Sequence, residues 1–487
     1  MKKHNESMLI DFYEFTMANG YFDHGYKDQI VYFDLFFRTI PNRGGYAIMA
    51  GLESVIDYIE NLAFTEEDID YLRQRDMFSD EFLTYLSTFT FTGDLYAVKE
   101  GTIIFPNEPI LTVRATAIEA QLIETYLLLA INHQSLIATK ASRLKHAAGD
   151  RLLIEMGARR AHGVSSANLG ARAAYIGGAD LTSNTYADRH LKVPANGTMA
   201  HSWIQLFDSE IDAFRAYAKT YPTQTTFLVD TYDTLKSGVP NAIKVIKEDL
   251  VPKGINKYAI RIDSGDLTYL SKCARRLLDE AGLPECKIVA SNALDEYLIK
   301  TIIDQGAPID IFGVGERLIT AKSDPVFGGV YKLVAMEENK RIMPKIKISD
   351  NPAKITTPHF KKLYRIYDKT TGNAHADLLT VHTETIDESK PLTIFNPEHT
   401  WQTTTYTDYT LKSLLIPIFK DGKRVYDVPT INEVRAHCQN ELSHLWDEMK
   451  RFEHPHKYYV DLSKKLYDSK MRLIKKHHDA IDDKSHQ

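Results

Sequence analysis

A short apolar run that ends in polar residues recurs seven times along the middle of the chain. Successive runs are roughly 20–30 residues apart, which leaves room for a loop, a helix and a return to the next strand. Parallel strands linked in this way predict a β/α barrel, whose functional groups lie at the carboxyl ends of the strands. The seven runs are Leu152–Met156, Ala179–Leu181, Gly197–Ala200, Phe227–Val229, Tyr258–Ile262, Lys287–Ala290 and Ile309–Phe312.

The segments on either side of these runs follow a different pattern, with alternating strands and few helices. Before the runs, Phe12–Tyr21 predicts a helix, and Ala117–Arg143 predicts one long helix because no Pro or Gly interrupts it. The residues after Gly328 alternate again and are expected to complete the sheet of the first domain. The predicted strands are Val31–Arg38, Ile103–Phe105, Ile110–Val113, Val330–Val334 and Met343–Ile348.

These patterns divide the chain into three parts. We expect an N-terminal α/β domain with a linking helix at residues 1–140, a barrel at 141–330, and a C-terminal segment at 331–487 that partly completes the first domain. The tail from Tyr458 to His478 predicts an amphipathic basic helix, with Leu462, Leu466 and Leu473 on one side. A solvated surface helix is favoured there over a binding element.

Composition narrows the class of protein. The chain has 487 residues, more than one ordinary core, and its hydrophobic content of 44% fits a globular protein with a large interior. Its net charge of −6 argues against a nucleic-acid-binding surface, which would need a basic stripe. Small molecules are therefore the expected ligands.

The cysteines and the apolar stretches indicate the compartment. Cys273, Cys286 and Cys438 are widely spaced and contain no Cys-x-x-Cys pair, so neither a disulfide framework nor a zinc site is indicated. Residues 1–6 lack the apolar stretch of a secretory signal. Tyr126–Ile131 is too short to span a membrane. We expect a cytoplasmic protein that has no membrane partner.

Two strand ends carry groups suited to phosphates and metal ions. Asp263 and Asp266 flank a glycine directly after a strand, where a pair of carboxylates could bind Mg²⁺ or ribose hydroxyls. Gly313 and Gly315 follow another strand and precede a predicted helix start, where backbone N–H groups could hold a phosphate.

Basic residues and a histidine end other strands. Arg159 and Arg160 are adjacent and point in opposite directions, so one is expected to face a ligand and the other to form an ion pair. Arg261 is a second inward-facing candidate. His201 follows a predicted strand and could act as a base, a metal ligand or a phosphoryl acceptor.

Several of these segments, in this order, resemble the nicotinate phosphoribosyltransferase family. The likeness extends from Asp11 to about Leu415. It implies a type II phosphoribosyltransferase fold, in which an α/β domain, sandwich-like in form, joins an irregular seven-stranded barrel, and in which a dimer has composite active sites. The matching segments are Arg159–Ala161, Gly197–Ser202, Arg261–Leu267 and Val330–Val334.

The resemblance also implies a reaction and roles for particular residues. The family forms nicotinate mononucleotide and pyrophosphate from nicotinate and phosphoribosyl pyrophosphate in NAD biosynthesis, with ATP hydrolysis coupled through a phosphohistidine. His201 matches that histidine, and Asp263 and Asp266 match the acids linked to ribose and Mg²⁺. Residues matching positions around nicotinate are Tyr13, Arg159, Thr198 and Arg261, and those matching the phosphoribosyl side are Ser291, Asn292, Gly313 and Gly315.

The chain departs from some relatives at Glu316, where they carry Thr, so the resemblance leaves open whether this side chain contributes to phosphate binding; backbone donors could still serve there. Two alternative functions remain open from the sequence. One is nicotinamide phosphoribosyltransferase activity, in which the same fold acts on an amide; the other is a non-catalytic barrel that binds phosphates or nucleotides. Quinolinate phosphoribosyltransferase activity is disfavoured because that substrate requires more cationic groups.

Overall fold

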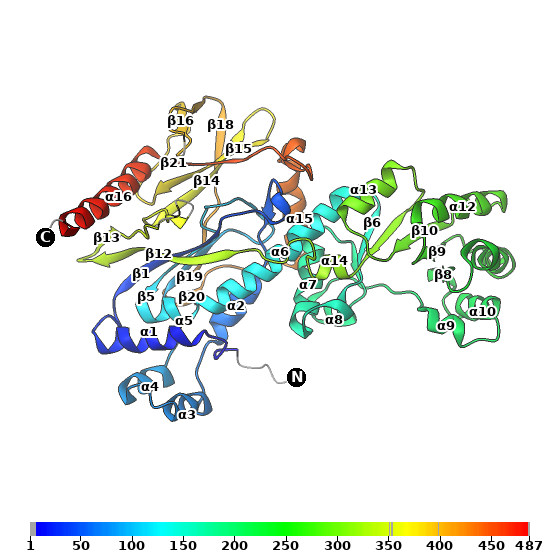
Figure 1. The fold of residues 1–487 in the computed structure, drawn as a ribbon, viewed down its shortest axis with the longest axis horizontal. Helices are drawn as coiled ribbons and strands as arrows, with labels where there is room; N and C mark the ends of the chain where they lie inside the picture. The colour runs from blue at the N-terminus through cyan, green and yellow to red at the C-terminus, as the bar shows by residue number, and fades with distance from the viewer. Residues whose placement is uncertain (1–5, 350, 352–353, 398, 486–487) are drawn as a thin grey trace. The chain divides into compact units, whose positions relative to one another are not determined.

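The computed structural model describes residues 6–349, 351, 354–397 and 399–485. The expectation for the first residues of the chain therefore falls mostly outside the described part. The chain forms two compact units, one of residues 1–136 and 326–487 and the other of residues 137–325 (Figure 1). The division into three parts, with boundaries near residues 140 and 330, stays a prediction.

The first unit is built around an antiparallel seven-stranded sheet. Strands from both ends of the chain contribute to it, so the segment after residue 326 does complete the N-terminal sheet. Its edge strand β13 contains Pro344, which lacks an N–H and is tolerated at a sheet edge. In spatial order the strands are β13 (Arg341–Pro344), β12 (Gly329–Glu338), β1 (Ile30–Phe37), β5 (Leu111–Thr116), β3 (Asp94–Ala97), β19 (Ile416–Lys420) and β20 (Lys423–Arg424).

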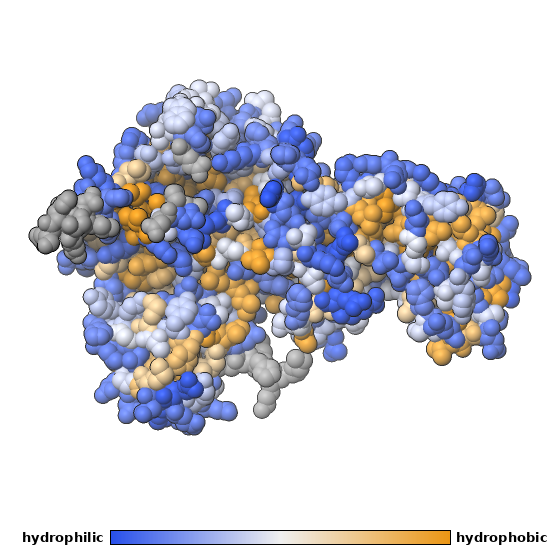
Figure 2. All heavy atoms as spheres, viewed as in Figure 1, coloured by the Kyte–Doolittle hydropathy of each residue, from blue (hydrophilic) through white to orange (hydrophobic). Residues whose placement is uncertain are grey.

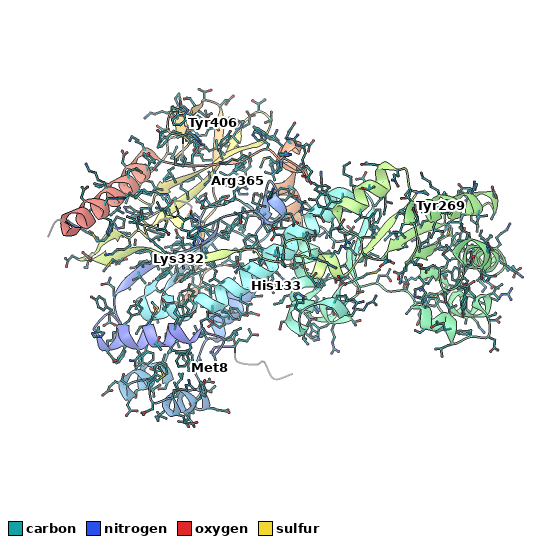
Figure 3. All side chains as sticks on the ribbon, in the orientation of Figure 1. Met8, His133, Tyr269, Lys332, Arg365 and Tyr406 are labelled. Carbon is teal, nitrogen blue, oxygen red and sulfur yellow. The ribbon has the colours of Figure 1, made fainter. Side chains whose placement is uncertain are left out.

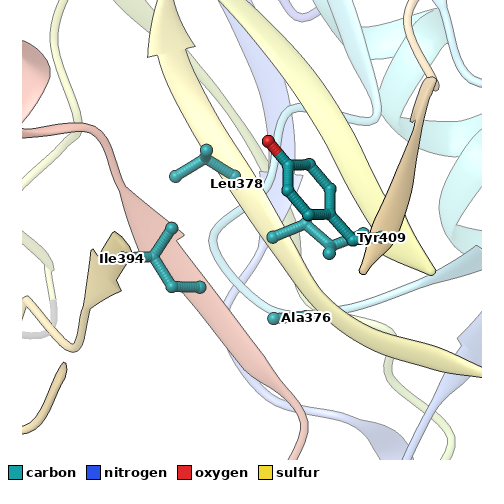
Figure 4. Packing of buried hydrophobic residues seen from close by; sticks show 5 residues of the cluster. Ala376, Leu378, Ile394 and Tyr409 are labelled. Atoms are coloured by element: carbon teal, nitrogen blue, oxygen red, sulfur yellow. The ribbon is translucent and has the colours of Figure 1, made fainter. Parts of the chain in front are cut away.

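A second, six-stranded sheet lies in the same unit, together with the short pair β2 (Ala47–Ile48) and β4 (Ile103–Ile104). Figure 4 shows part of the apolar cluster that packs on this sheet, with Tyr409 beside Leu378 and Ile394. Its strand order is β17 (Thr403–Tyr406), β16 (Leu392–Phe395), β21 (Tyr459–Leu462), β15 (Ala374–Val381), β14 (Lys361–Asp368) and β18 (Tyr409–Ser413).

Three helices of the first unit begin at a threonine that caps the helix. Thr65, Thr116 and Thr430 each accept a backbone N–H three residues ahead, and an acid at that position returns the contact. The helices of the first unit, capped or not, are α1 (Phe12–Asp23), α2 (Leu52–Asn61), α3 (Glu66–Gln74), α4 (Asp80–Ser87), α5 (Ala117–Leu122), α15 (Ile431–Ser443) and α16 (Lys464–Ser485). Helix α6 (Glu124–Ala148) runs from this unit into the second.

Two expectations for helices were wrong in detail. The predicted helix over 117–143 is interrupted at Ile123, which separates α5 from α6 although its backbone stays in the right-handed helical region. No Pro or Gly marks this break, and nothing in the structure explains it. The predicted C-terminal helix begins only at Lys464, because Tyr459–Leu462 pairs in parallel with β15 and so places Leu462 in a strand.

The second unit contains a parallel six-stranded sheet with helices between its strands, a half-barrel of β/α repeats. The sheet order is β7 (Leu181–Thr182), β6 (Leu152–Glu155), β11 (Ile311–Val314), β10 (Lys287–Ser291), β9 (Tyr258–Ile262) and β8 (Thr225–Leu228). The helices are α7 (Val164–Ile176), α8 (Thr185–Leu191), α9 (His201–Gln205), α10 (Glu210–Thr220), α11 (Val239–Val245), α12 (Leu267–Glu280), α13 (Glu296–Asp304) and α14 (Glu316–Ile319).

The mixed α/β class is confirmed, but the expected strand at Gly197–Ala200 was wrong. Only Ala195 pairs with the sheet, through one parallel bridge to Thr182. Pro194 has no N–H to donate and Gly197 weakens a strand, so the chain leaves the sheet before Thr198. A count of seven barrel strands is therefore not reached in the described residues.

Within the described part of the chain, no helix is long and apolar enough to cross a membrane. Hydrophilic residues cover much of the face seen in Figure 2.

Candidate active site

Three neighbouring strands of the half-barrel end in polar residues that contact one another. Strands β8, β9 and β10 are parallel, so their carboxyl ends lie at one edge of the sheet. Asp230 follows β8, Asp263 follows β9, and Ser291 ends β10. This is the edge at which β/α proteins bind their ligands.

Arg261 is the central cation of this edge. Its side chain is 14% exposed, and its Nη1 donates to the Thr198 hydroxyl at 2.8 Å and to the Met199 carbonyl at 3.3 Å. Its Nη2 lies 3.5 Å from Oδ1 of Asp263. The buried Nε–H has no hydrogen-bond partner among the described residues. A buried guanidinium donor without an acceptor is costly, so this position is suited to an acidic ligand.

The carboxylate of Asp263 links two strand ends. Its Oδ1 accepts a short hydrogen bond from the Ser291 hydroxyl, in addition to the contact with Arg261. Its backbone N–H donates to Oδ2 of Asp230 at 3.0 Å. Thr198, Arg261, Asp263 and Ser291, four of the predicted site residues, are thus brought together.

His201 joins the same network through Asp230. Its Nε2 lies 3.1 Å from Oδ1 of Asp230, whose side chain is 1% exposed, whereas the side chain of His201 is 38% exposed. The other oxygen of Asp230 accepts from the Ser264 hydroxyl at 2.6 Å as well as from the backbone of Asp263. With the proton on Nε2, the lone pair on Nδ1 of His201 is free to react.

Sequence reasoning assigned no role to Asp230 or Ser264. Asp230 stands directly after an apolar run, as the predicted site residues do, and that position was the available signal. Its partner His201 is 29 residues away along the chain, so the pairing itself is visible only in the fold.

Asp266 lies in the same turn as Asp263 but contacts different groups. Gly265 has φ +75°, which turns the chain, and the Asp266 carboxylate caps helix α12 by accepting from the backbone N–H of Tyr269 at 2.9 Å. Figure 3 labels Tyr269 on this helix. Asp266 is exposed, and its described hydrogen bond is this local cap.

Gly313 lies inside β11 and Gly315 directly follows this strand, and both lie close to Met156, which follows β6. A Cβ at Gly313 would meet Sδ of Met156 at 2.7 Å, and one at Gly315 would meet the Met156 carbonyl at 3.0 Å. A side chain at either position would therefore crowd Met156. Gly315 directly precedes the four-residue helix α14.

The side chain of Glu316 is held by cations of the protein. Its carboxylate accepts from Nζ of Lys322 at 2.7 Å and lies 4.0 Å from Nε of Arg160. The hydrogen bond from Lys322, and then the charge of Arg160, lower the pKa of Glu316. Of the adjacent arginines, Arg160 thus forms an ion pair, and Arg159 is exposed.

Two other predicted residues do not join these contacts. Asn292 is exposed and has a left-handed backbone with φ 94° just after Ser291. Tyr13 belongs to the other unit, on α1, where burial and the carboxylate of Glu124 raise its pKa. Among the residues that the structure describes, no three His, Cys, Asp or Glu side chains are grouped so as to hold a metal ion.

Comparisons with known proteins identify the family. Residues 8–132 match the model of the nicotinate phosphoribosyltransferase N-terminal domain, and residues 360–470 match that of the C-terminal domain. The nicotinate phosphoribosyltransferase of Bacillus subtilis is 45% identical over 468 residues, which cover 96% of this chain and 95% of the relative. The human nicotinate phosphoribosyltransferase is 30% identical over 518 residues, 94% of this chain and 95% of the relative.

Solved structures agree with the sequence relatives. The crystal structure of human nicotinic acid phosphoribosyltransferase matches with a TM-score of 0.83 at 27% identity, covering 96% of this chain and 100% of that one. A nicotinate-nucleotide pyrophosphorylase from Pyrococcus furiosus shares the fold, with a TM-score of 0.69 at 22% identity over 91% of this chain and 97% of that one. The matches span nearly the full length of the chain and of its relatives, and the chain belongs to the nicotinate phosphoribosyltransferase family.

Proposed function

We propose that this protein forms nicotinate mononucleotide and pyrophosphate from nicotinate and phosphoribosyl pyrophosphate in the salvage branch of NAD biosynthesis, and that ATP hydrolysis is coupled to the transfer through a phosphohistidine at His201. The nicotinate phosphoribosyltransferases of Bacillus subtilis and human, which align over nearly the whole chain, support the transferase activity. The ATP-dependent part rests on the resemblance of Gly197–Ser202 to the family motif and on the contacts of His201.

The observation that carries the choice of substrate is the donor set of Arg261. Its Nε–H is buried without an acceptor, and the Thr198 hydroxyl lies 2.8 Å from its Nη1. A carboxylate of nicotinate would accept from the guanidinium and restore the missing hydrogen bond. The neutral amide of nicotinamide would leave the positive charge without a counter-ion.

In the transfer step, the bond between C1 of the ribose and the pyrophosphate oxygen breaks, and the pyridine nitrogen forms a bond to C1. The nitrogen already has a lone pair, so no strong base is required and positioning dominates catalysis. Mg²⁺ would be held by Asp263 and Asp266 together with substrate oxygens, and it would neutralise the leaving pyrophosphate. Arg159 is an exposed cation suited to the same charge.

The phosphoribosyl group would be held by neighbouring strand ends. The backbone N–H groups around Gly313 and Gly315 would donate to a phosphate, because glycine carries no side chain of its own. Ser291 and Asn292 lie at the end of β10 and would contribute polar contacts to the ribose phosphate. Glu316 is already paired with Lys322, so its charge is partly neutralised beside these donors.

In the coupled reaction, Nδ1 of His201 would attack the γ-phosphorus of ATP and ADP would leave; water would later release the phosphoryl group as phosphate. Asp230 holds the proton on Nε2 and stabilises the ring while it carries positive charge. Phosphate on His201 would add roughly two negative charges beside the substrate and so organise Mg²⁺ and nearby loops.

Tyr13 lies in the other unit, and we propose that it contacts the pyridine ring as its family position implies. The same resemblance supports a homodimer with composite sites and a cytoplasmic location.

The test is an assay of mononucleotide formation with nicotinate or nicotinamide, each with and without ATP. The expected result is product from nicotinate, faster with ATP, and transfer of the γ-phosphoryl group of ATP to wild-type protein but not to His201→Ala. That variant should retain some transfer without ATP. Preference for nicotinamide, or binding of phosphoribosyl pyrophosphate without turnover of either pyridine, would overturn the proposal.

A further inference from the structure

A cluster of cations and histidines lies in the first unit, far along the chain from the half-barrel residues. His359 precedes β14 and His382 follows β15, and these antiparallel strands bring the two rings together with centroids 6.1 Å apart. Helix α16 packs on β15 and carries Lys465, which donates to Thr383 beside His382, and Arg472, whose charge acts on His359. These two residues are seven apart and so lie on one side of the helix. We call these four residues the His359 cluster.

The contacts of the neighbouring Lys361 account for the backbone conformation at His359. Its ammonium is buried and donates to the carbonyls of Thr357, Pro358 and His359, and it pairs with Asp34 at 2.7 Å. The wrapping of the chain around one ammonium holds His359 at φ 89°, a left-handed conformation uncommon for histidine. Lys361 is thereby fully engaged and is not part of the His359 cluster.

Nδ1 of His359 and Nδ1 of His382 are both buried without a hydrogen-bond partner in the described part of the chain. Burial, followed by the charges of Lys361, His382, Lys465 and Arg472, lowers the pKa of His359 to about 4. Burial also lowers the pKa of His382, and the Phe360 carbonyl acts in the opposite direction.

Hydroxyl groups beside the cluster are oriented as donors. Lys465 donates to the Thr383 hydroxyl at 3.2 Å, and Lys470 donates to the Thr357 hydroxyl at 3.3 Å. A hydroxyl that accepts from an ammonium keeps its own proton for another acceptor. The carboxylate beside them, Glu384, accepts from the backbone of Val381 and from Ser463. Donors therefore outnumber acceptors here.

We propose that the His359 cluster is a binding site for a phosphate-type oxyanion, separate from the substrate site of the half-barrel. A tetrahedral oxyanion offers several acceptor oxygens at once, which suits an ammonium, a guanidinium, a hydroxyl and two imidazoles that would present Nδ1–H in the complex. Inorganic phosphate and pyrophosphate share this chemistry. The inference does not depend on the proposed reaction.

Binding is measured on the full-length protein carrying [¹³Cε1]-histidine, in a buffer without phosphate and at constant ionic strength. Phosphate, pyrophosphate or chloride is titrated, and the resonances of His359 and His382 are followed by NMR. Assignment comes from His359→Gln and His382→Gln. Phosphate or pyrophosphate should shift both resonances to saturation and raise the pKa of His359, because the anion stabilises the imidazolium. The oxyanion with the lower Kd is the ligand.

The decisive variant is Lys465→Gln combined with Arg472→Gln, which leaves the histidines in place as reporters. The Kd should rise about tenfold or more, since two charge-assisted contacts are lost. Lys464→Gln is the matched control, because Lys464 lies on the same helix and pairs with Asp468. Chloride shifts as large as those with phosphate would overturn the proposal. So would His359 and His382 resonances that stay unchanged at anion concentrations that saturate the half-barrel site. An unchanged Kd in the double variant would overturn it as well.

Discussion

The imidazole of His201 lies 3.1 Å from the carboxylate of Asp230, and that carboxylate also holds the turn after the next strand. One oxygen of Asp230 faces the histidine, and the other accepts from the Asp263 backbone and the Ser264 hydroxyl. Asp230 is therefore a positioning residue for two parts of the site. It fixes the tautomer of His201 and the conformation of the loop that carries Asp263.

Asp230→Asn should disable His201 while changing little in shape. The oxygen of the new amide will remain with the two donors of the turn, so its NH₂ group will face Nε2 of His201. The imidazole proton then moves to Nδ1, which loses its lone pair. Phosphorylation by ATP should fall by about 10²- to 10⁴-fold, the range of a positioned acid–base group. Single-turnover transfer of the γ-phosphoryl group measures this.

The control is Asp233→Asn, three residues further on, where the carboxylate caps a short helical turn through the backbone of Leu235 and Lys236. It should retain phosphorylation within about twofold, because asparagine also caps well. Equal rates in wild type and Asp230→Asn would show that the contact between His201 and Asp230 has no role in the chemistry.

Asp263→Asn and Asp266→Asn should both weaken use of phosphoribosyl pyrophosphate, and Asp263→Asn should do so more strongly. Asp263 contacts Arg261 and Ser291, so its loss disturbs the whole sheet edge. Asp266 caps α12, and asparagine preserves a cap, so the second variant removes charge with little loss of stability. We expect kcat/KM at limiting Mg²⁺ to fall about 100-fold or more for Asp263→Asn, the range for electrostatic groups in active sites.

The Asp266 variant is the sharper of the two measurements. If Asp266→Asn keeps the wild-type dependence on Mg²⁺, Asp266 acts only as a helix cap. Asp266→Ala then separates the roles, since loss of the cap should cost about 1 kcal/mol of unfolding free energy.

Much of the half-barrel was predictable because its strands are buried runs with abrupt ends. Tyr258–Ile262 was predicted with the bounds that the structure shows, since both faces of β9 are covered and its apolar pattern is continuous. The predicted strand at Gly197–Ala200 was wrong, because an apolar run does not show whether its backbone N–H groups pair with a neighbouring strand. Leu462 was placed in a helix because the residues around it also fit helical spacing, and only the pairing of Tyr459–Leu462 with β15 decides the matter.

Part of the candidate site was predictable from single residues, but its network was not. Position after a predicted strand identified Asp263 and Ser291, because parallel strands end at one edge, and Arg261 was identified as an inward-facing residue of its own strand. The role of Asp230 depends on its contact with His201, which lies on a separate segment of the chain. The spacing of the two residues in the sequence does not predict that their side chains meet. Asp266 resembles Asp263 in sequence, yet the turn at Gly265 directs it to the start of α12.

Glu14→Gln should alter how stability depends on pH. The side chain is fully buried and accepts from the Thr125 hydroxyl, and burial raises the pKa of Glu14 to about 8. A folded-state pKa above the unfolded value gives stability that is complete below about pH 4.5 and lost as the pH rises to about 8. Glutamine keeps the hydrogen bond and cannot ionise, so the variant should gain stability relative to wild type across this window.

The gain should be on the order of 4 kcal/mol, at about 1.4 kcal/mol for each unit of pKa. Urea unfolding of both proteins between about pH 5 and pH 8 measures it. Glu81→Gln, at an exposed position of α4, is the control and should show a constant difference from wild type. A constant difference for Glu14→Gln as well would mean that Glu14 titrates as it does in the unfolded chain.

Arg261→Lys should reduce use of nicotinate while changing use of nicotinamide little. Lysine keeps the positive charge but lacks the planar guanidinium. In Arg261 that group contacts Thr198, Met199 and Asp263 at once, and its Nε–H remains available for a ligand. Each charged hydrogen bond contributes roughly 1.5–3 kcal/mol, so kcat/KM for nicotinate should fall about tenfold to a hundredfold. The neutral amide of nicotinamide does not pair with the charge at this position, so its kcat/KM should change little. The measurement is kcat/KM for both pyridines at fixed phosphoribosyl pyrophosphate.

Arg275→Lys, on the outer helix α12, is the control and should leave both values near wild type, because Arg275 contacts Asp279 and two backbone carbonyls. Equal losses for the two pyridines would assign Arg261 to the phosphoribosyl side, since both reactions share that substrate.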